Sequence, residues 1–326
     1  MTRIPASPPA ILPLPSDRER PLWSVMIPVY NCSIFLPQTL NCLLRQQISE
    51  DMMQIEVVDD ASTDTDVEAL VNEIGKGRIK YYRQPQNVGS LRNFETCINR
   101  AQGQLVHLLH GDDKVREGFY AKITSLFEQY PEAGAAFCRY SCVDENGARI
   151  YDQGRIIQKD GILENWLVQI AERQRTQYVA KVVRREVYEK LGSFYGLTYG
   201  EDWEMWVRIA KHYPVAYTPE ILADYRKHTN SITENKYLTG QNLEDISNVI
   251  NLIQTYLPLN QRQEVLRRSK SYYAAYGLKT ASQLWSRSKN KQAVYAQVKQ
   301  ALRLYKTPLL FWKTAKIYFK VTFNKV

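Results

Sequence analysis

The 326-residue sequence predicts an α/β protein with a mostly parallel central sheet flanked by helices, plus a C-terminal helical extension. Three observations support this prediction. Short apolar runs alternate with helix-patterned stretches from Trp23 onward, as in strand–helix–strand units. Most intervals between these runs are long enough for a crossover helix, which favours parallel strands covered on both faces. Beyond Asn242 almost every segment has a helical pattern.

The chain begins with a leader, residues 1–21, that contains six of the fourteen prolines. Proline builds neither helix interiors nor sheet ladders, so we expect this leader to be disordered. Two helices are predicted in the part that follows, one capped by Ser33 and one that starts at Ser90 and ends at Gly103. The strand-length apolar runs of this part are 24–29, 55–58, 79–82, 105–109 and 135–138.

The pattern changes after Val143, where a turn signal precedes a longer helical stretch and a predicted strand at 178–183. A helix is predicted at 201–211, which stops before Pro214, and a strand and turn at 216–225. The predicted domains are the leader 1–21, an α/β domain 22–240 and a basic helical extension 241–326.

The net charge of +9 is distributed unevenly along the chain. Residues 261–326 carry a charge of +14 and the remainder carries −5. Three interpretations of this basic tail stay open. It is an ordinary solvated helix face, or residues 305–326 contact an anionic membrane surface through lysines and aromatic rings such as Trp312, or it binds nucleic acid. Nucleic acid is not favoured, because the sequence contains no recognisable reader motif.

Localisation is predicted from the cysteines and the apolar runs. The five cysteines have no metal-finger spacing, which favours buried thiols in a reducing compartment. The sequence shows neither a signal peptide pattern nor an uncharged apolar stretch of about 18 residues. We expect a cytoplasmic protein, peripheral on the inner face of the plasma membrane if the tail binds lipid.

Carboxylates follow two of the predicted strands. One strand runs into Asp59 and Asp60, and another runs into the segment His110-Gly111-Asp112-Asp113. Turn formation and helix capping explain one such cluster, but two clusters favour a ligand site, because ligands of open parallel sheets bind outside the carboxyl ends of strands. Asp112 and Asp113 offer oxygen ligands for Mg²⁺ or Mn²⁺, which substrate phosphates usually complete. The pattern therefore indicates a diphosphate partner.

A third acidic pair, Glu201 and Asp202, follows the glycine-punctuated loop 192–200 at the first turn of a predicted helix. The helix dipole stabilises acids at this place without any further function. The functional interpretation is a general base that takes the proton of an attacking hydroxyl, while Trp203 or Trp206 stacks on a sugar.

Arg226, Lys227 and His228 follow the predicted strand that ends at Tyr225. These donors can contact a diphosphate together, and His228 is a further candidate metal ligand. A lone histidine is more often a structural or surface residue, and the four histidines of this chain are too few for a site made of imidazoles alone.

Six motifs occur in the order and approximate spacing of a known family. They are SVMIPVYN at 24–31, VVDDASTD at 57–64, NVGSLRNF at 87–94, LLHGDD at 108–113, GEDWEMWVRIA at 200–210 and YRKHTNSIT at 225–233. Over about residues 22–235 the chain resembles the family 2 glycosyltransferases, which have a GT-A (Rossmann-like) fold. VVDD alone also resembles the acidic pocket of receiver domains. The alternative is therefore a non-catalytic, receiver-like module that senses a phosphate or a nucleotide.

The resemblance implies an inverting transferase that uses a nucleotide-diphosphate sugar and a saccharide or lipid-linked acceptor in cell-surface polysaccharide or glycolipid synthesis. It implies that Asp202 deprotonates the acceptor hydroxyl beside Glu201, and that Asp112 binds the metal, with Asp113 next to it. Either Asp59 or Asp60 would contact the base. The other positions implied for the donor and its nucleotide are Pro28, Tyr30, Asn31, Asn87, Gly89, Arg92, Asn93, His110 and Gly111.

The sequence departs from the family pattern at one position. The Asp-x-Asp motif of the family is His110-Gly111-Asp112 here, so its first acid is missing. An imidazole can hydrogen-bond a ribose hydroxyl but adds no negative charge. We therefore expect weaker metal affinity than in the family at large.

Overall fold

The structure is a computed structural model that describes residues 2–15, 19–229 and 231–324. Contacts divide the chain into two units. The sheet unit comprises residues 1–166, 176–198 and 212–227, and the helical unit comprises 167–175, 199–211 and 228–326. The helical unit takes in residues 228–240, which the sequence analysis assigns to the α/β domain, and the predicted domain boundaries stay a prediction.

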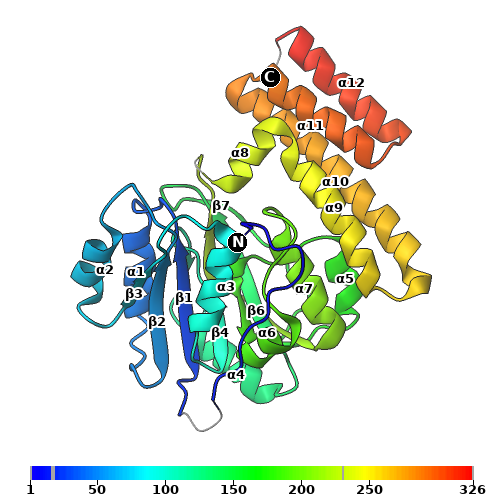
Figure 1. Ribbon diagram of the computed structural model, residues 1–326. Helices are drawn as coiled ribbons and strands as arrows, with labels where there is room; N and C mark the ends of the chain where they lie inside the picture. The colour runs from blue at the N-terminus through cyan, green and yellow to red at the C-terminus, as the bar shows by residue number, and fades with distance from the viewer. Residues whose placement is uncertain (1, 16–18, 230, 325–326) are drawn as a thin grey trace. The chain divides into compact units, whose positions relative to one another are not determined.

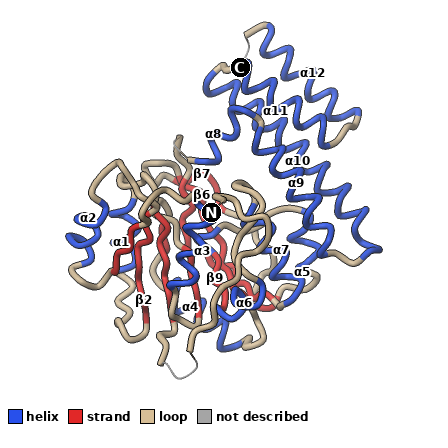
Figure 2. Tube along the Cα trace, viewed as in Figure 1, coloured by secondary structure: helices blue, strands red, loops and turns tan. Residues whose placement is uncertain are grey.

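Ten strands form one sheet in the part of the sheet unit that the structure describes, shown in red in Figure 2. Their bounds are β1 (Trp23–Val29), β2 (Met53–Asp59), β3 (Lys80–Arg83), β4 (Leu105–Leu108), β5 (Lys114–Val115), β6 (Ala135–Val143), β7 (Arg149–Asp152), β8 (Gly161–Ile162), β9 (Lys181–Arg184) and β10 (Val215–Arg226). The order is β3-β2-β1-β4-β9-β6-β10-β5, with β7 beside β6 and β8 beside β10. Strands β3, β2, β1 and β4 are parallel, β6 is parallel to β10, and β9 runs antiparallel between β4 and β6. The predicted α/β fold with a central sheet is confirmed. The sheet is mixed, because its longer strands β1, β2, β6 and β10 pair in parallel, whereas β5, β7, β8 and β9 pair antiparallel.

Helices cover this sheet, as Figure 1 shows. Those of the sheet unit are α1 (Leu36–Leu44), α2 (Val67–Gly75), α3 (Ser90–Arg100), α4 (Phe119–Gln129) and α6 (Arg185–Leu191). Helix α3 packs on β1 and β2, and α4 packs on β6 and β10. Strands β1 and β2 are buried along their whole length, because helices and neighbouring strands enclose them. The apolar core of the sheet unit lies between these layers.

The remaining described α-helices lie in the helical unit, except for their end residues Trp166 and His212, which belong to the sheet unit. They are α5 (Trp166–Glu172), α7 (Glu201–His212), α8 (Ile232–Thr239), α9 (Gln241–Ile253), α10 (Leu259–Ser288), α11 (Lys291–Leu304) and α12 (Pro308–Thr322). Helix α10 packs against α9, α11 and α12. The predicted helical extension is thus confirmed. Among the described helices, none combines the length and the apolar character needed to cross a membrane.

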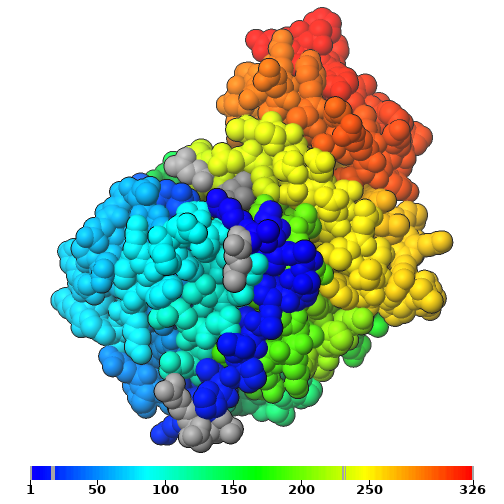
Figure 3. All heavy atoms as spheres, viewed as in Figure 1, coloured from blue at the N-terminus to red at the C-terminus, as the bar shows by residue number. Residues whose placement is uncertain are grey.

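The leader differs most from its prediction. Over residues 2–15 it is an irregular segment that lies on the sheet unit, drawn in dark blue in Figure 3 beside the cyan region that includes α3. Ile11 is only 2% exposed. The amides of Ser193 and Gly196 donate hydrogen bonds to the carbonyls of Pro9 (2.8 Å) and Pro5 (2.9 Å). Proline lacks a donor but keeps an acceptor, so a proline-rich segment can be held by amides of neighbouring loops.

A smaller difference concerns the strand predicted at 178–183. Its first three residues form a 3₁₀ turn, η1 (Tyr178–Ala180), and the strand β9 starts at Lys181. Periodicity alone does not separate a short apolar turn from a short strand. Pairing with β4 and β6 determines where this strand begins.

Candidate active site

Three predicted motifs meet at the carboxyl ends of neighbouring parallel strands in the sheet unit. Strand β1 lies between β2 and β4, with Val29 in register with Asp59 and Met26 with Leu108. The segments that follow are joined by hydrogen bonds: the Asp60 amide donates to the Val29 carbonyl (2.8 Å). Parallel strands deliver their following loops to one edge of a sheet. The first acids of both clusters therefore follow strands that flank β1 on either side.

The carboxylate of Asp59 is fully used inside the fold. Its Oδ1 accepts hydrogen bonds from the Ser62 amide (2.9 Å) and hydroxyl (2.6 Å), and its Oδ2 accepts from Tyr81 (2.8 Å) and Arg83 (2.5 Å). The side chain is buried. Four donors saturate a carboxylate. Of the two residues predicted for the base, Asp59 is therefore a structural residue, and Asp60 remains the candidate.

Asp60 holds the loop that precedes α3. Its two carboxylate oxygens accept from the amides of Val88 (2.7 Å) and Gly89 (2.9 Å), and its carbonyl accepts from the Asn87 side-chain amide (3.1 Å). Burial raises the pKa of Asp60, although the two amide bonds lower it. Each oxygen keeps a free acceptor direction, which suits a contact with a nucleobase.

The other nucleotide candidates differ in exposure. Tyr30 is 51% exposed, and the Oδ1 of Asn31 accepts from the Thr63 amide (2.8 Å). Asn93 is buried and donates to the Val58 carbonyl (2.9 Å), which ties α3 to β2. Pro28 is buried within β1. The packing of β1 and α3 encloses the side chains of Pro28 and Asn93. That these two residues border the nucleotide stays a prediction.

The residues of the predicted metal motif lie together. One ligand atom each from His110, Asp112 and Asp113 lies within 4.8 Å of the others. The His110 ring stacks with Phe94 (centroids 5.3 Å apart) and packs against Tyr178 (4.4 Å). Its Nε2 is buried without a hydrogen-bond partner in the described part of the chain. A buried imidazole nitrogen next to two carboxylates fits a divalent cation.

Long-range hydrogen bonds hold this segment in place. The Thr39 hydroxyl donates to the carbonyls of Gly111 (3.0 Å) and Asp113 (2.8 Å). The Arg226 amide donates to Asp113 Oδ1 (2.8 Å), and its Nε donates to the Asp112 carbonyl (2.8 Å). Gly111 is required here, since a Cβ would lie 2.8 Å from the Cys32 sulfur.

The prediction that Arg226 contacts a diphosphate is wrong, because its side chain is buried and bound within the fold. Its guanidinium is buried and also donates to the Glu145 carbonyl (2.8 Å) and the Gln38 side chain (2.8 Å). Its N–H groups therefore hold neighbouring segments of the fold together. Sequence reasoning missed Thr39 as a support of the metal motif. No local pattern identifies the supporting role of Thr39 or of Arg226, because their partners lie 70 or more positions away in the chain.

The protonation states in this cluster follow from burial. Burial, and next the charge of Asp112, raise the pKa of Asp113, while its bond from Arg226 lowers it. Burial lowers the pKa of His110. The neutral imidazole is therefore favoured, which is the form that binds a metal.

The predicted base, Asp202, lies in the first turn of α7 in the helical unit and is buried. Its Oδ1 accepts from the Trp203 amide (2.7 Å), and its Oδ2 accepts from the Gln174 side-chain amide. Burial, followed by the charge of Glu201, raises the pKa of Asp202 well above its usual range. Gln174 is a functional candidate that the sequence analysis did not identify.

The predicted stacking of Trp203 or Trp206 on a sugar is wrong. Both side chains are buried, Trp203 completely. The Trp203 Nε1 donates to the Ile170 carbonyl (2.6 Å), and its ring packs on Tyr273 (5.0 Å). Residues three positions apart share one face of a helix, and here that face is the core face of α7. Only the carboxylate part of this motif remains a candidate.

His228 belongs to the helical unit, whereas the three residues of the metal cluster belong to the sheet unit. It lies in the segment that precedes α8, and its backbone carbonyl accepts a hydrogen bond from the Ser231 amide (3.2 Å). The proposal that it binds metal stays a prediction.

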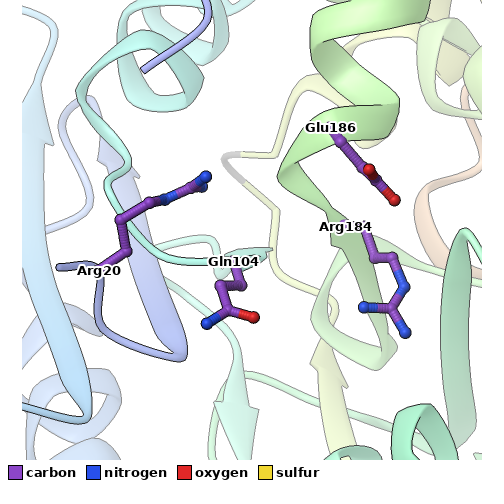
Figure 4. Close-up of a pocket in the computed structure, with 4 residues that line it drawn as sticks. All are labelled: Arg20, Gln104, Arg184 and Glu186. Atoms are coloured by element: carbon purple, nitrogen blue, oxygen red, sulfur yellow. The ribbon is translucent and has the colours of Figure 1, made fainter. Parts of the chain in front are cut away.

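A cavity of about 390 Å³ opens at the opposite end of the strands (Figure 4). Arg20, Gln104, Arg184 and Glu186 line it, and Gln104 directly precedes β4. Arg20 and Arg184 donate to the carbonyls of Gly103 and Ala133 (both 2.8 Å). The cavity is therefore separate from the acidic edge, and its arginines have structural partners.

Comparisons with known proteins agree with this arrangement. A family model described as glycosyl transferase family 2 matches residues 24–192. The putative teichuronic acid biosynthesis glycosyltransferase TuaG of Bacillus subtilis is 27% identical over 231 residues, which cover 67% of this chain and 84% of TuaG.

Two solved structures share the fold. S. aureus TarS (residues 1–349) in complex with UDP-GlcNAc has a TM-score of 0.66 at 14% identity, with 93% of this chain and 92% of that chain covered. The mannosyltransferase PcManGT from Pyrobaculum calidifontis, in complex with GDP-Man and Mn²⁺, has a TM-score of 0.57 at 18% identity. The match covers 98% of this chain and 92% of PcManGT.

The predicted GT-A fold is confirmed by these likenesses. The family match extends over more than half of the chain and includes the strands that carry both acidic clusters. This family match does not favour the alternative of a non-catalytic, receiver-like module. The chain belongs to glycosyl transferase family 2.

Proposed function

We propose that this protein is an inverting glycosyltransferase, which moves a sugar from a nucleoside-diphosphate sugar to an acceptor hydroxyl during synthesis of a cell-surface polysaccharide or glycolipid. The His110–Asp112–Asp113 cluster at the carboxyl edge of the sheet carries this proposal. The TarS and PcManGT structures are complexes with UDP-GlcNAc and GDP-Man, which supports a nucleotide-sugar donor for this protein. The name of TuaG supports a role in polysaccharide synthesis.

Donor binding is assigned to the sheet unit. Tyr30 offers a half-exposed ring on which a base can stack, and Asp60 offers carboxylate acceptors for its N–H groups. Asn87 and Arg92 lie on the loop and first turn that Asp60 holds. These residues would line the pocket of the nucleoside diphosphate.

Asp112 and Asp113, with the free Nε2 of His110, would hold Mg²⁺ or Mn²⁺; the Mn²⁺ named with PcManGT supports this choice. When bound, such an ion neutralises charge on a departing diphosphate. Thr39 and Arg226 keep the two carboxylates in position. Ring packing against Phe94 and Tyr178 fixes the plane of the imidazole.

Asp202 is proposed as the base. It would accept the proton of the acceptor hydroxyl as the hydroxyl oxygen bonds to the anomeric carbon and the bond from that carbon to the diphosphate oxygen breaks. Attack from the side opposite the leaving group inverts the anomeric centre. A raised pKa makes a carboxylate a stronger base, and the bonds from Gln174 and the Trp203 amide orient it.

Helix α12 supports a location at a membrane surface. Leu310, Thr314, Ile317 and Val321 form its buried face. Its exposed large apolar residues are Leu309, Phe311, Trp312, Tyr318, Phe319 and, just beyond the helix, Phe323. Lysines at 313, 316 and 320 follow one side of this surface, and each contributes on the order of 1 kcal/mol near an anionic leaflet. We propose that α12 brings the enzyme to a lipid-linked acceptor on the inner face of the plasma membrane.

The test is donor hydrolysis by the purified full chain with Mn²⁺, across UDP- and GDP-sugars. We expect release of the nucleoside diphosphate from at least one donor, and loss of that release in Asp112→Asn. Absence of both hydrolysis and nucleoside-diphosphate binding across the panel would refute the proposal. The anomeric configuration of the product, measured by NMR, tests inversion.

A further inference from the structure

The N-terminal strap, residues 2–15, ends on the residues proposed to bind the donor. The Arg3 guanidinium donates to Oδ1 of Asn87, and the carbonyl of Thr2 accepts from the Nε of Arg92 (3.0 Å). A Cβ added at Gly89 would lie 3.1 Å from the Arg3 Nε. All of these residues belong to the sheet unit. The strap therefore touches three positions of the nucleotide motif at once.

The strap is fixed to the sheet unit by its other end. Ile11 is 2% exposed, whereas its neighbour Leu12 is 70% exposed. The Leu12 amide donates to the Asn99 side chain (3.1 Å), and its carbonyl accepts from the Arg185 guanidinium (3.2 Å). With the amide bonds to Pro5 and Pro9, these contacts hold residues 5–12 along their length. This anchoring presents Arg3 at one place.

The charges around Arg3 favour an anionic ligand. Arg83 is paired with Asp59 (2.5 Å), and Arg92 is paired with Glu95 (2.6 Å). No ion pair within the described residues includes Arg3. The charge of Arg3 acts on Asp60, but no described ion pair joins the two side chains, and the Asp60 oxygens accept the amides of Val88 and Gly89. A nucleoside diphosphate would bring the negative charge that an exposed guanidinium pairs with.

We propose that Arg3 is a donor-binding residue, which the N-terminal strap carries to the nucleotide end of the donor site to bind the nucleoside-diphosphate anion. This inference rests on the proposed function. It assigns a part of donor recognition to a segment outside the matched family region, which begins at residue 24. The opposite relationship, a strap that competes with the donor for Asn87 and Arg92, makes the opposite prediction for affinity.

The test compares Arg3→Ala with the unchanged full chain in calorimetric titrations with UDP and with GDP, each with Mn²⁺. We expect about fivefold weaker binding of the nucleotide that the unchanged protein binds, because one exposed charge-assisted contact is lost. Arg3→Lys retains the charge and recovers part of this affinity. Arg287→Ala, which removes an exposed cation in α10, serves as the control and leaves affinity unchanged.

A matched pair of variants tests whether nucleotide binding depends on the anchoring of the strap as well as on the charge of Arg3. Ile11→Ala removes a buried anchor and is expected to weaken nucleotide binding as Arg3→Ala does, whereas Leu12→Ala alters an exposed neighbour and has no effect. In the double variant Arg3→Ala/Ile11→Ala the two losses do not add, because a released strap no longer presents Arg3.

The outcomes distinguish this inference from the proposed function. Unchanged or tighter binding by Arg3→Ala overturns the inference while the function stands, and tighter binding identifies the strap as a competitor. If the unchanged protein binds neither nucleotide and hydrolyses no donor, the proposed function and the inference fail together.

Discussion

Gln174 donates a hydrogen bond from its side-chain amide to a carboxylate oxygen of Asp202, 28 positions later in the chain. Asp202 is buried, and its other oxygen accepts from the Trp203 amide (2.7 Å). Both bonds stabilise the ionised carboxylate, whereas burial and the charge of Glu201 oppose ionisation. Burial and the charge of Glu201 outweigh the hydrogen bonds, so the pKa of Asp202 is raised.

Activity is predicted to fall with decreasing pH well above the usual pKa of an aspartate, about 3.9, because the base must be ionised. Gln174→Leu removes a donor to the carboxylate, so the acid limb of kcat/KM moves to higher pH. Glu201→Gln removes a neighbouring negative charge, so the limb moves to lower pH. Measuring kcat/KM from pH 5 to 9 checks both. Shifts in the same direction would contradict the assignment of Asp202.

Asp112→Asn and Asp202→Asn are each predicted to abolish sugar transfer while the fold stays intact. Since the pKa of Asp202 is raised in the folded protein, ionisation of this residue costs stability at pH 8, and Asp202→Asn does not lower Tm there. Asp160→Asn, at a half-buried ion pair with Lys122, is the control for transfer. Retention of more than a few per cent of activity in either variant would remove the residue from its role.

His110→Asp is predicted to strengthen Mn²⁺ binding several-fold, since it restores an acid where the family motif has one and adds negative charge beside Asp112. The same change removes the ring that packs against Phe94 and Tyr178, so Tm decreases. Titration of Mn²⁺ by calorimetry, with a thermal melt in chelator, separates the two effects. Weaker Mn²⁺ binding would contradict this prediction and show that the imidazole holds the ion better than a carboxylate at this position.

Asp59 and Asp60 are predicted to differ despite being neighbours. Asp59→Asn weakens the four hydrogen bonds of a buried carboxylate and lowers the free energy of unfolding by about 2 kcal/mol. Asp60→Asn is expected to weaken nucleotide binding more than it lowers stability. Urea denaturation and UDP or GDP titration of both variants test this. Equal effects on stability and binding would remove the distinction.

Helix α12 is predicted to bind anionic vesicles. Trp312→Ser/Phe319→Ser changes two rings that are 54% and 52% exposed, so the fold is unaffected while vesicle binding decreases. Flotation with phosphatidylglycerol vesicles at two salt concentrations measures both the apolar and the charge contribution. Arg287→Ala, outside α12, is the control. Truncation of residues 305–326 without loss of binding or of salt sensitivity would reject α12 as the anchor.

The sequence by itself determined the features that depend on local pattern. The runs that became β1, β2, β4 and β6 are apolar stretches of strand length, and their interiors are buried on both faces as such runs require. The acids after β2 and β4 fall at one edge because parallel strands share their carboxyl ends. The fold class and the family therefore follow from residues close together in the chain.

Only the tertiary structure decided which of these polar residues are available to a ligand. Arg226 binds the carboxylate of Asp113, 113 positions away, and Tyr81 and Arg83 saturate Asp59. Trp203 faces the core, and the proline-rich leader is anchored through Ile11. Each outcome depends on burial and on hydrogen-bond partners that are distant in the chain. Such partners leave no local pattern, since the energy of a buried polar group depends on what surrounds it in space.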